Sequence, residues 1–397
     1  MTITRFGNDF NLQEDKIYLD SATIGKMPVS SLDTIVDFYQ KEGSAAIRGV
    51  HHEAMESMKK LENNRKNIAD FFKVETTQVS FLPSKETALT NALFSLEAID
   101  KRRIITSILE DHSILAPVIK THQSFGNELQ YLNFEDEQEL TDKIHEQITS
   151  KADILILSSL TPTNGIKRDW KKIAKLCHEI EATFILDISN SVGHEPIELN
   201  GISPDIILTA SCVGALGPQG LALQILSNDI EKAMNPLIVG GGSIIALEET
   251  MFHLTSSGSK FECGILNLAN ILGLTNSLEL LSNVGLSKIQ EHELKLSTLI
   301  RKGISNLPSI ELIEIEGVEY GPITTFASDI LDANDTAIIL DDMKNIIIRS
   351  GALCAHLFMY ELPYNDLARI STHLYNTEEE IKTLIEFLEE ILSKIET

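Results

Sequence analysis

The sequence has no long unbroken run of apolar residues, and its opening stretch MTITRFGNDFNLQED has no apolar core. A helix that spans a bilayer needs about 20 predominantly apolar residues, and a secretion signal needs an apolar segment of about 7–15 residues. We therefore expect a cytoplasmic protein that does not cross a membrane.

Cysteine is scarce and widely spaced. The chain has 4 cysteines in 397 residues, Cys177, Cys212, Cys263 and Cys354, and none belongs to a C-x-x-C pair. Disulfide frameworks and cysteine-based zinc sites usually show closer or more regular spacing. We therefore expect reduced thiols, no disulfide framework and no metal site.

Positively charged residues are also few relative to acidic ones. The chain has 33 lysines and arginines against 58 aspartates and glutamates, a formal net charge of −25. Such a surface repels the phosphate backbones of nucleic acids and anionic lipid headgroups. The composition therefore argues against nucleic acid and membrane surfaces as partners and is typical of a soluble folded protein.

Short apolar runs alternate with segments of helical periodicity between about residue 60 and residue 226. The runs predict strands at 78–82, 103–108, 153–159, 183–187, 205–210 and 221–226. Strands that alternate with helices are typical of an α/β fold around a mostly parallel sheet. Binding sites in such sheets lie at the carboxyl ends of the strands, where Ser159, Asp187 and Ser211 stand in this sequence.

The pattern changes after about residue 285. A long helix at about 285–307 precedes short strands, and a last amphipathic helix begins near Thr377 with three glutamates, which suit the positive end of a helix dipole. The sequence thus predicts a large α/β domain over 21–284 and a small α+β domain over 285–397. The N-terminal segment 1–20 is expected to pack near the small domain.

Several segments resemble, in order and over nearly the whole chain, the class V aminotransferases, specifically cysteine desulfurases of the SUF-system type. These segments are IYLDSAT (17–23), the R-G-[IV]-H-like helix (47–72), LEDHSILAP (109–117), LDISNSVGHEPIEL (186–199), GGGSI (240–244) with FECGILN (261–267), IIRSGALCAHLF (347–358) and ARISTHLYNTEEEIKTL (368–384). The resemblance implies the pyridoxal 5′-phosphate (PLP) transferase fold type I, with a seven-stranded sheet, and a homodimer.

Members of that family hold PLP through a lysine Schiff base, and a loop cysteine takes sulfur from the substrate. The resemblance places Asp187 at the pyridinium nitrogen, His112 against the ring and Ser211 at the phosphate. Arg369 matches the arginine that forks onto the substrate carboxylate, and Cys354 matches the sulfur-accepting cysteine.

Other residues near the matched cysteine add chemistry or alternatives. Arg349 is expected to bind substrate with Arg369, and Arg349 or His356 would supply the positive field that a reactive thiolate needs. Cys354 could instead be a packed apolar residue. If the family fold holds, Cys212 and Cys263 would approach Cys354, and zinc or an iron–sulfur cluster stays open as an alternative.

Several family positions are changed. Gly214 replaces the Schiff-base lysine, and Asn190 shortens the glutamine that bonds the ring hydroxyl. The phosphate turn becomes Ser84-Lys85-Glu86, and the threonine offered across the dimer becomes Ile265. Lys85 could bind an anion, but pairing with Glu86 or exposure to solvent is the favoured interpretation.

These changes predict a diverged desulfurase-like protein with no covalently bound cofactor. It would handle sulfur or persulfide at Cys354, with a small carboxylate or amino-acid-like ligand and a protein sulfur acceptor or an active relative as partner. One alternative is a non-catalytic binding or scaffold subunit. Another is an enzyme that binds PLP noncovalently on Asp187 and His112, with Lys85 at the phosphate.

Overall fold

The computed structural model describes residues 9–10, 15–43, 45–46, 49–97, 103–201 and 203–395. Ile47 and Arg48 of the R-G-[IV]-H-like segment lie outside the described residues, as do 1–8 and 11–14 of the predicted N-terminal segment. None of the helices in the described ranges is long and apolar enough to cross a membrane.

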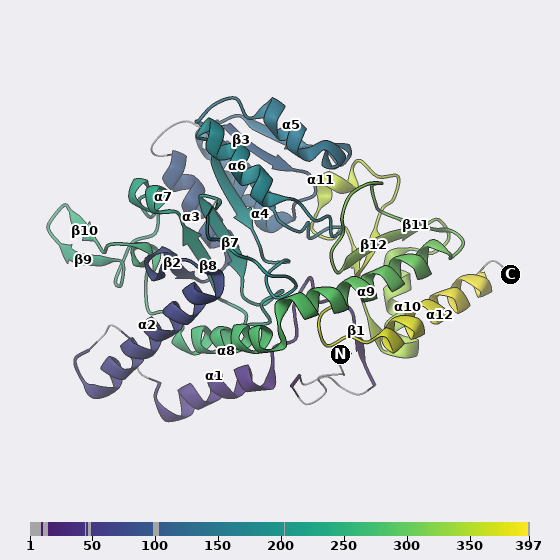
Figure 1. Cartoon of the computed structure of the whole chain (residues 1–397), viewed down its shortest axis with the longest axis horizontal. Coiled ribbons are helices and arrows are strands. Elements are labelled where there is room, and N and C mark those ends of the chain that lie inside the picture. Colours follow the sequence, from purple (N-terminus) through teal and green to yellow (C-terminus); the bar gives the residue numbers. More distant parts are fainter. Residues whose placement is uncertain are drawn as a thin grey trace.

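The centre of the molecule is a seven-stranded sheet with the strand order β2-β8-β7-β6-β5-β3-β4 (Figure 1). Its strands are β2 (Val79–Leu82), β3 (Arg103–Ser107), β4 (Leu129–Leu132), β5 (Asp153–Ser158), β6 (Thr183–Asp187), β7 (Ile206–Ala210) and β8 (Ala222–Leu226). Strand β8 runs antiparallel to both of its neighbours, and the pairs from β4 to β7 are parallel. The predicted mostly parallel α/β sheet is confirmed.

The sheet is buried on both faces, which explains why its strands read as continuous apolar runs. In β5, Leu155 and Leu157 pack in one apolar cluster, whereas Ile154 and Ile156 pack in another. The helices of this part are α1 (Val29–Lys41), α2 (His52–Phe72), α3 (Lys85–Glu97), α4 (His112–Phe125), α5 (Leu140–Gln147), α6 (Trp170–Ile180), α7 (Asn228–Ala233) and α8 (Leu268–Val284). Short 3-10 helices span Thr76–Gln78, Glu135–Glu139 and Gly258–Phe261.

A second, antiparallel sheet has the order β11-β12-β15-β14. Its strands are β11 (Ile310–Leu312), β12 (Ile323–Ser328), β14 (Arg349–Gly351) and β15 (Leu367–Ser371). Around it lie α9 (Leu286–Ser305), α10 (Ala333–Lys344), α11 (His356–Met359) and α12 (Glu378–Ile395) (Figure 1). The division into a large domain over 21–284 and a small domain over 285–397 stays a prediction.

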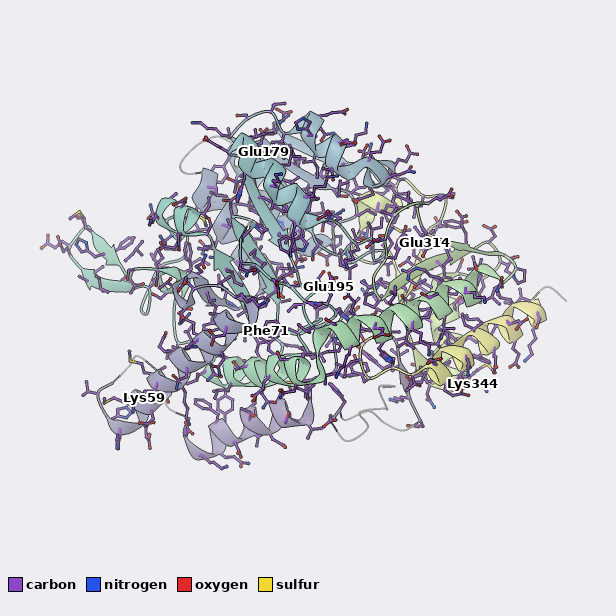
Figure 2. The ribbon with its side chains drawn as sticks, in the orientation of Figure 1. Lys59, Phe71, Glu179, Glu195, Glu314 and Lys344 are labelled. Atoms are coloured by element: carbon purple, nitrogen blue, oxygen red, sulfur yellow. The ribbon has the colours of Figure 1, made fainter. Side chains whose placement is uncertain are left out.

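Two smaller strand pairs of the described residues lie outside these sheets. Strand β1 (Ile17–Tyr18) runs parallel to β13 (Ile346–Ile347), and this pairing joins the N-terminal residues to the end of α10. Strands β9 (Ile244–Leu247) and β10 (Phe252–Leu254) form a hairpin that projects from the molecule on the left of Figure 1. Charged side chains such as Glu179 and Lys344 point outward from the helices (Figure 2).

Candidate functional site

The predicted site lies at the carboxyl edge of the seven-stranded sheet. Asp187 ends β6, and the backbone N–H of Ser159, just beyond β5, donates to the Asp187 carbonyl at 2.8 Å. Ser211 follows β7 directly. The prediction that these three residues meet at one edge follows from the parallel strand order and agrees with the structure.

Asp187 is already paired inside the protein. Its Oδ2 lies 2.5 Å from Lys85 Nζ, and its Oδ1 accepts from the Ser189 backbone N–H at 2.9 Å and hydroxyl at 2.6 Å. The exposed fraction is 6% for Lys85 and 2% for Asp187. The prediction that Lys85 pairs with Glu86 or faces solvent is therefore wrong, because the buried carboxylate of Asp187 needs a cation.

Lys85 places a positive charge where the start of a helix usually stabilises a negative one. Lys85 is the first residue of α3, where the helix dipole favours an anion and disfavours a cation. Burial also lowers the pKa of Lys85, but Asp187 and Asp111 outweigh burial, and the pKa is raised overall. The ammonium is held between carboxylates, so it is a fixed charge and no phosphate is needed to neutralise it.

Asp111 links this ion pair to α4. Its Oδ1 accepts from the Ser113 backbone N–H at 2.9 Å and so caps the helix. Burial raises the pKa of Asp111, but the charge of Lys85 and the hydrogen bonds from Ser113 lower it by more, and the net shift is downward.

The backbone at Gly214 has no room for a side chain. A Cβ built there would lie 2.1 Å from the Val192 carbonyl oxygen and 2.9 Å from the His194 ring. The neighbouring Gly193 has φ +87°, and a Cβ there would lie 2.0 Å from the Gly214 oxygen. Two segments thus pass backbone to backbone at this point, and only glycine permits their approach.

His112, predicted to stack on a cofactor ring, stacks on another imidazole instead. The rings of His112 and His356 have centroids 4.9 Å apart and an interplanar angle of 13°. His112 Nε2 and His356 Nδ1 are 2.9 Å apart, and both residues are exposed. The contact joins the start of α4 to the start of α11, next to the loop that carries Cys354.

Cys354 is exposed, and its backbone lies in the left-handed region with φ +58°. Leu353 before it has φ +50° and is buried. The left-handed conformation costs an L-residue roughly 1–2 kcal/mol, and such strain is concentrated at functional sites. Arg349 Nη2 lies 3.9 Å from Cys354 Sγ and brings a positive charge to the thiol.

Arg369 is buried and already bonded. Its Nη1 donates to the Pro162 carbonyl at 2.7 Å, and its Nη2 reaches the Thr23 hydroxyl at 2.7 Å and the Asp20 carboxylate at 3.3 Å. Burial lowers the pKa of Arg369, and the charge of Asp20 opposes that shift. Its Nε has no hydrogen-bond partner within the described part of the chain, so the contact with a ligand carboxylate stays a prediction.

Two other predicted cofactor contacts, Ser211 and Asn190, are buried inside the protein. Ser211 is fully buried, and its hydroxyl donates to the Pro218 carbonyl, so the predicted phosphate contact would require this hydrogen bond to open. Asn190 is buried, and within the described part of the chain no hydrogen-bond partner reaches its Oδ1.

PLP does not fit the residues as they stand. The carboxylate that would face the ring nitrogen holds Lys85, and the serine that would meet the phosphate holds a carbonyl. Gly214 offers no amine and no space for one. A ring nitrogen could pair with Asp187 Oδ2 only after the Lys85–Asp187 pair had separated.

A cluster of buried histidine and glutamate side chains that the sequence analysis did not single out lies next to Gly214. In the described ranges, one group of three His, Cys, Asp or Glu residues has all its ligand atoms within 4.8 Å of one another: His194, Glu293 and His373. The predicted alternative of a cysteine-based cluster is therefore wrong, because Cys212, Cys263 and Cys354 form no such group.

The three residues of this cluster come from a loop after β6, from α9 and from the segment after β15. Burial lowers the pKa of His194 to about 4 and that of His373 to about 3, and it raises the pKa of Glu293 well above its usual range. The imidazoles are therefore neutral at neutral pH. His194 belongs to the segment matched at 186–199, but no spacing signal connects it with the other two.

The chain matches the family model described as "Aminotransferase class-V" over residues 17–384. A relative from Methanothermobacter thermautotrophicus, named "Probable cysteine desulfurase", is 27% identical over 390 residues, which cover 96% of both chains. A relative of the same name from Pyrococcus abyssi is 27% identical over 397 residues, covering 98% of this chain and 97% of its own.

A solved structure gives the same result for the fold. The apo cysteine desulfurase from Thermococcus onnurineus superposes with a TM-score of 0.91 at 25% identity, covering 97% of each chain. The predicted fold, that of type I PLP transferases, is confirmed.

Proposed function

This chain belongs to the class V aminotransferase family, and within it we propose a diverged cysteine desulfurase-like protein that carries sulfur on Cys354 and has lost Schiff-base chemistry. The observation that supports this proposal best is the buried Lys85–Asp187 ion pair, which takes the carboxylate that the ring nitrogen of the family's cofactor would need. No lysine occurs between Lys175 and Lys232 to replace the one expected at position 214.

Cys354 has features of a thiol that accepts sulfur. It is exposed, its loop has left-handed backbone, and the Arg349 guanidinium stabilises the negative charge that the thiolate would carry. We propose that the thiolate attacks the outer sulfur of a persulfide donor. A bond forms between Sγ and that sulfur, the donor's sulfur–sulfur bond breaks, and the donor leaves as a thiolate. No oxidant is needed.

Transfer of sulfur is tested with glutathione persulfide as the donor. After incubation and alkylation, mass spectrometry of the peptides should find one extra sulfur on Cys354. The Cys354→Ser variant should lose this modification, and Cys263→Ser should keep it, because Cys263 is also exposed but contacts no arginine among the described residues. Sulfide release from L-cysteine at rates typical of the family would contradict the proposal.

A second candidate, a non-catalytic binding subunit, is favoured by apolar side chains on the surface. Ile245, Leu247 and Ile265 have exposed fractions of 73%, 74% and 69%. Ile245 and Leu247 lie two positions apart on β9. Neighbouring exposed apolar side chains mark protein interfaces, and we propose that a second copy of this chain covers them. If Cys354→Ser replaces the unchanged chain in cells without loss of the chain's function there, this candidate is favoured over the sulfur carrier.

A further inference from the structure

We propose that His194, Glu293 and His373 form a binding site for a divalent transition-metal ion of the zinc class, open to an adjacent cavity. The three ligand atoms lie within 4.8 Å of one another, and all three residues are buried. Two imidazole nitrogens and a carboxylate, with a further position left for water, are the ligand set of open zinc sites. The proposal does not depend on the fate of PLP or on Cys354.

Glu293 lies between the two imidazoles. Its Oε2 is 2.7 Å from His194 Nδ1, and its Oε1 is 3.3 Å from His373 Nδ1. The rings themselves have centroids 4.2 Å apart. The two Nδ1 atoms therefore face one carboxylate from either side, and an ion placed among the three would meet both imidazoles and the carboxylate.

The tautomer of His373 suits a metal ligand. Its Nε2 lies 3.0 Å from the Gly214 carbonyl oxygen, which can only accept, so Nε2 carries the proton and Nδ1 carries a lone pair. A metal-bound histidine usually donates its other N–H to such a carbonyl or carboxylate. The Leu374 backbone N–H lies 2.8 Å from the same Nδ1, and an ion would displace this contact together with the 2.7 Å contact between His194 Nδ1 and Glu293 Oε2.

Glu293 Oε1 has no hydrogen-bond partner within the described part of the chain, although the residue is only 2% exposed. Leaving a buried carboxyl oxygen unsatisfied costs about 1–3 kcal/mol or more. The nearby Lys167 does not neutralise it, because its Nζ is 2.5 Å from Glu195 Oε2. A bound cation would satisfy the oxygen that the protein leaves unpaired.

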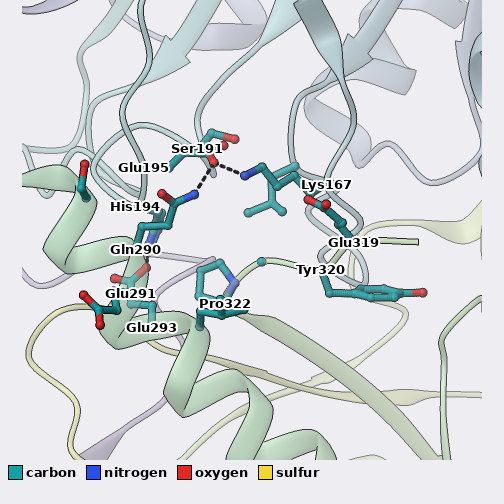
Figure 3. A pocket seen from close by; sticks show the side chains of 14 residues that line it. Lys167, Ser191, His194, Glu195, Gln290, Glu291, Glu293, Glu319, Tyr320 and Pro322 are labelled. Atoms are coloured by element: carbon teal, nitrogen blue, oxygen red, sulfur yellow. Dashed lines mark hydrogen bonds and ion pairs between the residues drawn. The ribbon is translucent and has the colours of Figure 1, made fainter. Parts of the chain in front are cut away.

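A cavity of about 360 Å³ reaches the cluster, and His194 and Glu293 are part of its wall. Figure 3 shows both side chains beside Ser191, Gln290 and the Lys167–Glu195 pair. Glu291 and Glu319 also line it, so the wall of the cavity has an excess of negative charge that attracts cations. The cavity gives an ion a path and gives water the position that the protein leaves open.

The ligand set also indicates which ions are preferred. Imidazole nitrogen suits zinc, nickel and cobalt, whereas magnesium and calcium prefer sites made of oxygen atoms alone. We therefore expect Zn²⁺ and Co²⁺ to bind, and Mg²⁺ not to compete with them.

The test uses the full chain, treated with a chelator and then freed of it. Calorimetric titration with Zn²⁺ should give a single ion per chain, and Co²⁺ should give visible ligand-field bands without a thiolate charge-transfer band. Glu293→Gln keeps the shape of the side chain and should weaken Zn²⁺ binding by about tenfold or more. Replacing a residue that only hydrogen-bonds to a metal ligand already costs about tenfold in affinity, and replacing the ligand itself should cost at least as much.

Two controls separate the cluster from other ligands. His253 and Glu248 form an exposed pair, with 3.2 Å between Nε2 and Oε1, so His253→Gln removes a comparable surface pair and should leave Zn²⁺ affinity unchanged. Cys354→Ser should also leave it unchanged. If Glu293→Gln fails to fold, His373→Asn takes its place. Absence of Zn²⁺ binding to the folded chain, or unchanged affinity in the folded cluster variant, would overturn the proposal.

Discussion

At the scale of single residues, the structure replaces a cofactor contact by a contact within the protein. Lys85 and Asp187 are 102 positions apart in sequence and meet only because α3 begins beside the end of β6. The sequence predicted that Asp187 lies at a strand end, since strand ends follow from apolar runs. It did not predict its partner, because the choice between Asp187, Glu86 and solvent depends on burial.

Lys85→Met is expected to lower the free energy of unfolding by about 3–5 kcal/mol, because it leaves the buried Asp187 carboxylate without its cation. The double variant Lys85→Met with Asp187→Leu should regain most of that loss, since both charges are then removed. Urea unfolding curves of the two variants measure the difference. A single variant as stable as the unchanged chain would show that the pair is not buried as described.

Thiol reactivity is predicted to separate the cysteines by burial. Burial raises the pKa of Cys177 from its ordinary value of 9.0 to about 12, so this thiol stays protonated at pH 9 in the folded chain. Iodoacetamide at that pH should modify the exposed Cys263 and Cys354 and spare Cys177 until denaturant is added. Peptide mass spectrometry reads the outcome, and rapid labelling of Cys177 in the native protein would contradict it.

At the scale of elements, the apolar runs predicted six strands of the large sheet to within one residue at each end. Strand β4 was missed because it lies at the sheet's edge, where Leu132 is buried but the other three residues are only half-buried. The last helix was predicted near Thr377 and begins at Glu378. The close approach of Gly193 and Gly214 has no signal in the sequence, because it depends on how two loops pack.

Asp111 and Asp169 offer a matched pair of helix caps. Asp169 caps α6 by accepting from the Lys172 N–H at 3.2 Å, and Asp169→Ala should cost about 1 kcal/mol. Asp111→Ala should cost more, because it also removes a carboxylate that stabilises the buried Lys85. Thermal unfolding of both variants measures the difference, and equal losses would contradict the link between α4 and the ion pair.

The extra stability from Asp111 should depend on pH in a defined direction. Its pKa is lowered in the folded chain, so its contribution is complete above the ordinary value of 3.8 and is lost as the pH falls below it. The stability difference between Asp111→Ala and the unchanged chain should therefore shrink in acid. A difference that grows in acid would contradict the assignment.

At the scale of the whole molecule, the hairpin of β9 and β10 carries apolar side chains into solvent. If a second copy covers them, Leu247→Glu should reduce the mass measured by light scattering towards that of a monomer. Ile338→Glu, an exposed position on α10 with a fraction of 58%, serves as control and should leave the mass unchanged. A monomeric unchanged chain would contradict the proposed homodimer.

The central claim is that Lys85 occupies the Asp187 carboxylate that the ring nitrogen of PLP would need. Its most direct test is the near-ultraviolet and visible absorbance of the purified protein after addition of PLP and gel filtration. The account predicts no band that elutes with the protein. A PLP band that survives gel filtration, and that Asp187→Ala removes, would show that the pair opens to admit the cofactor and would contradict the account.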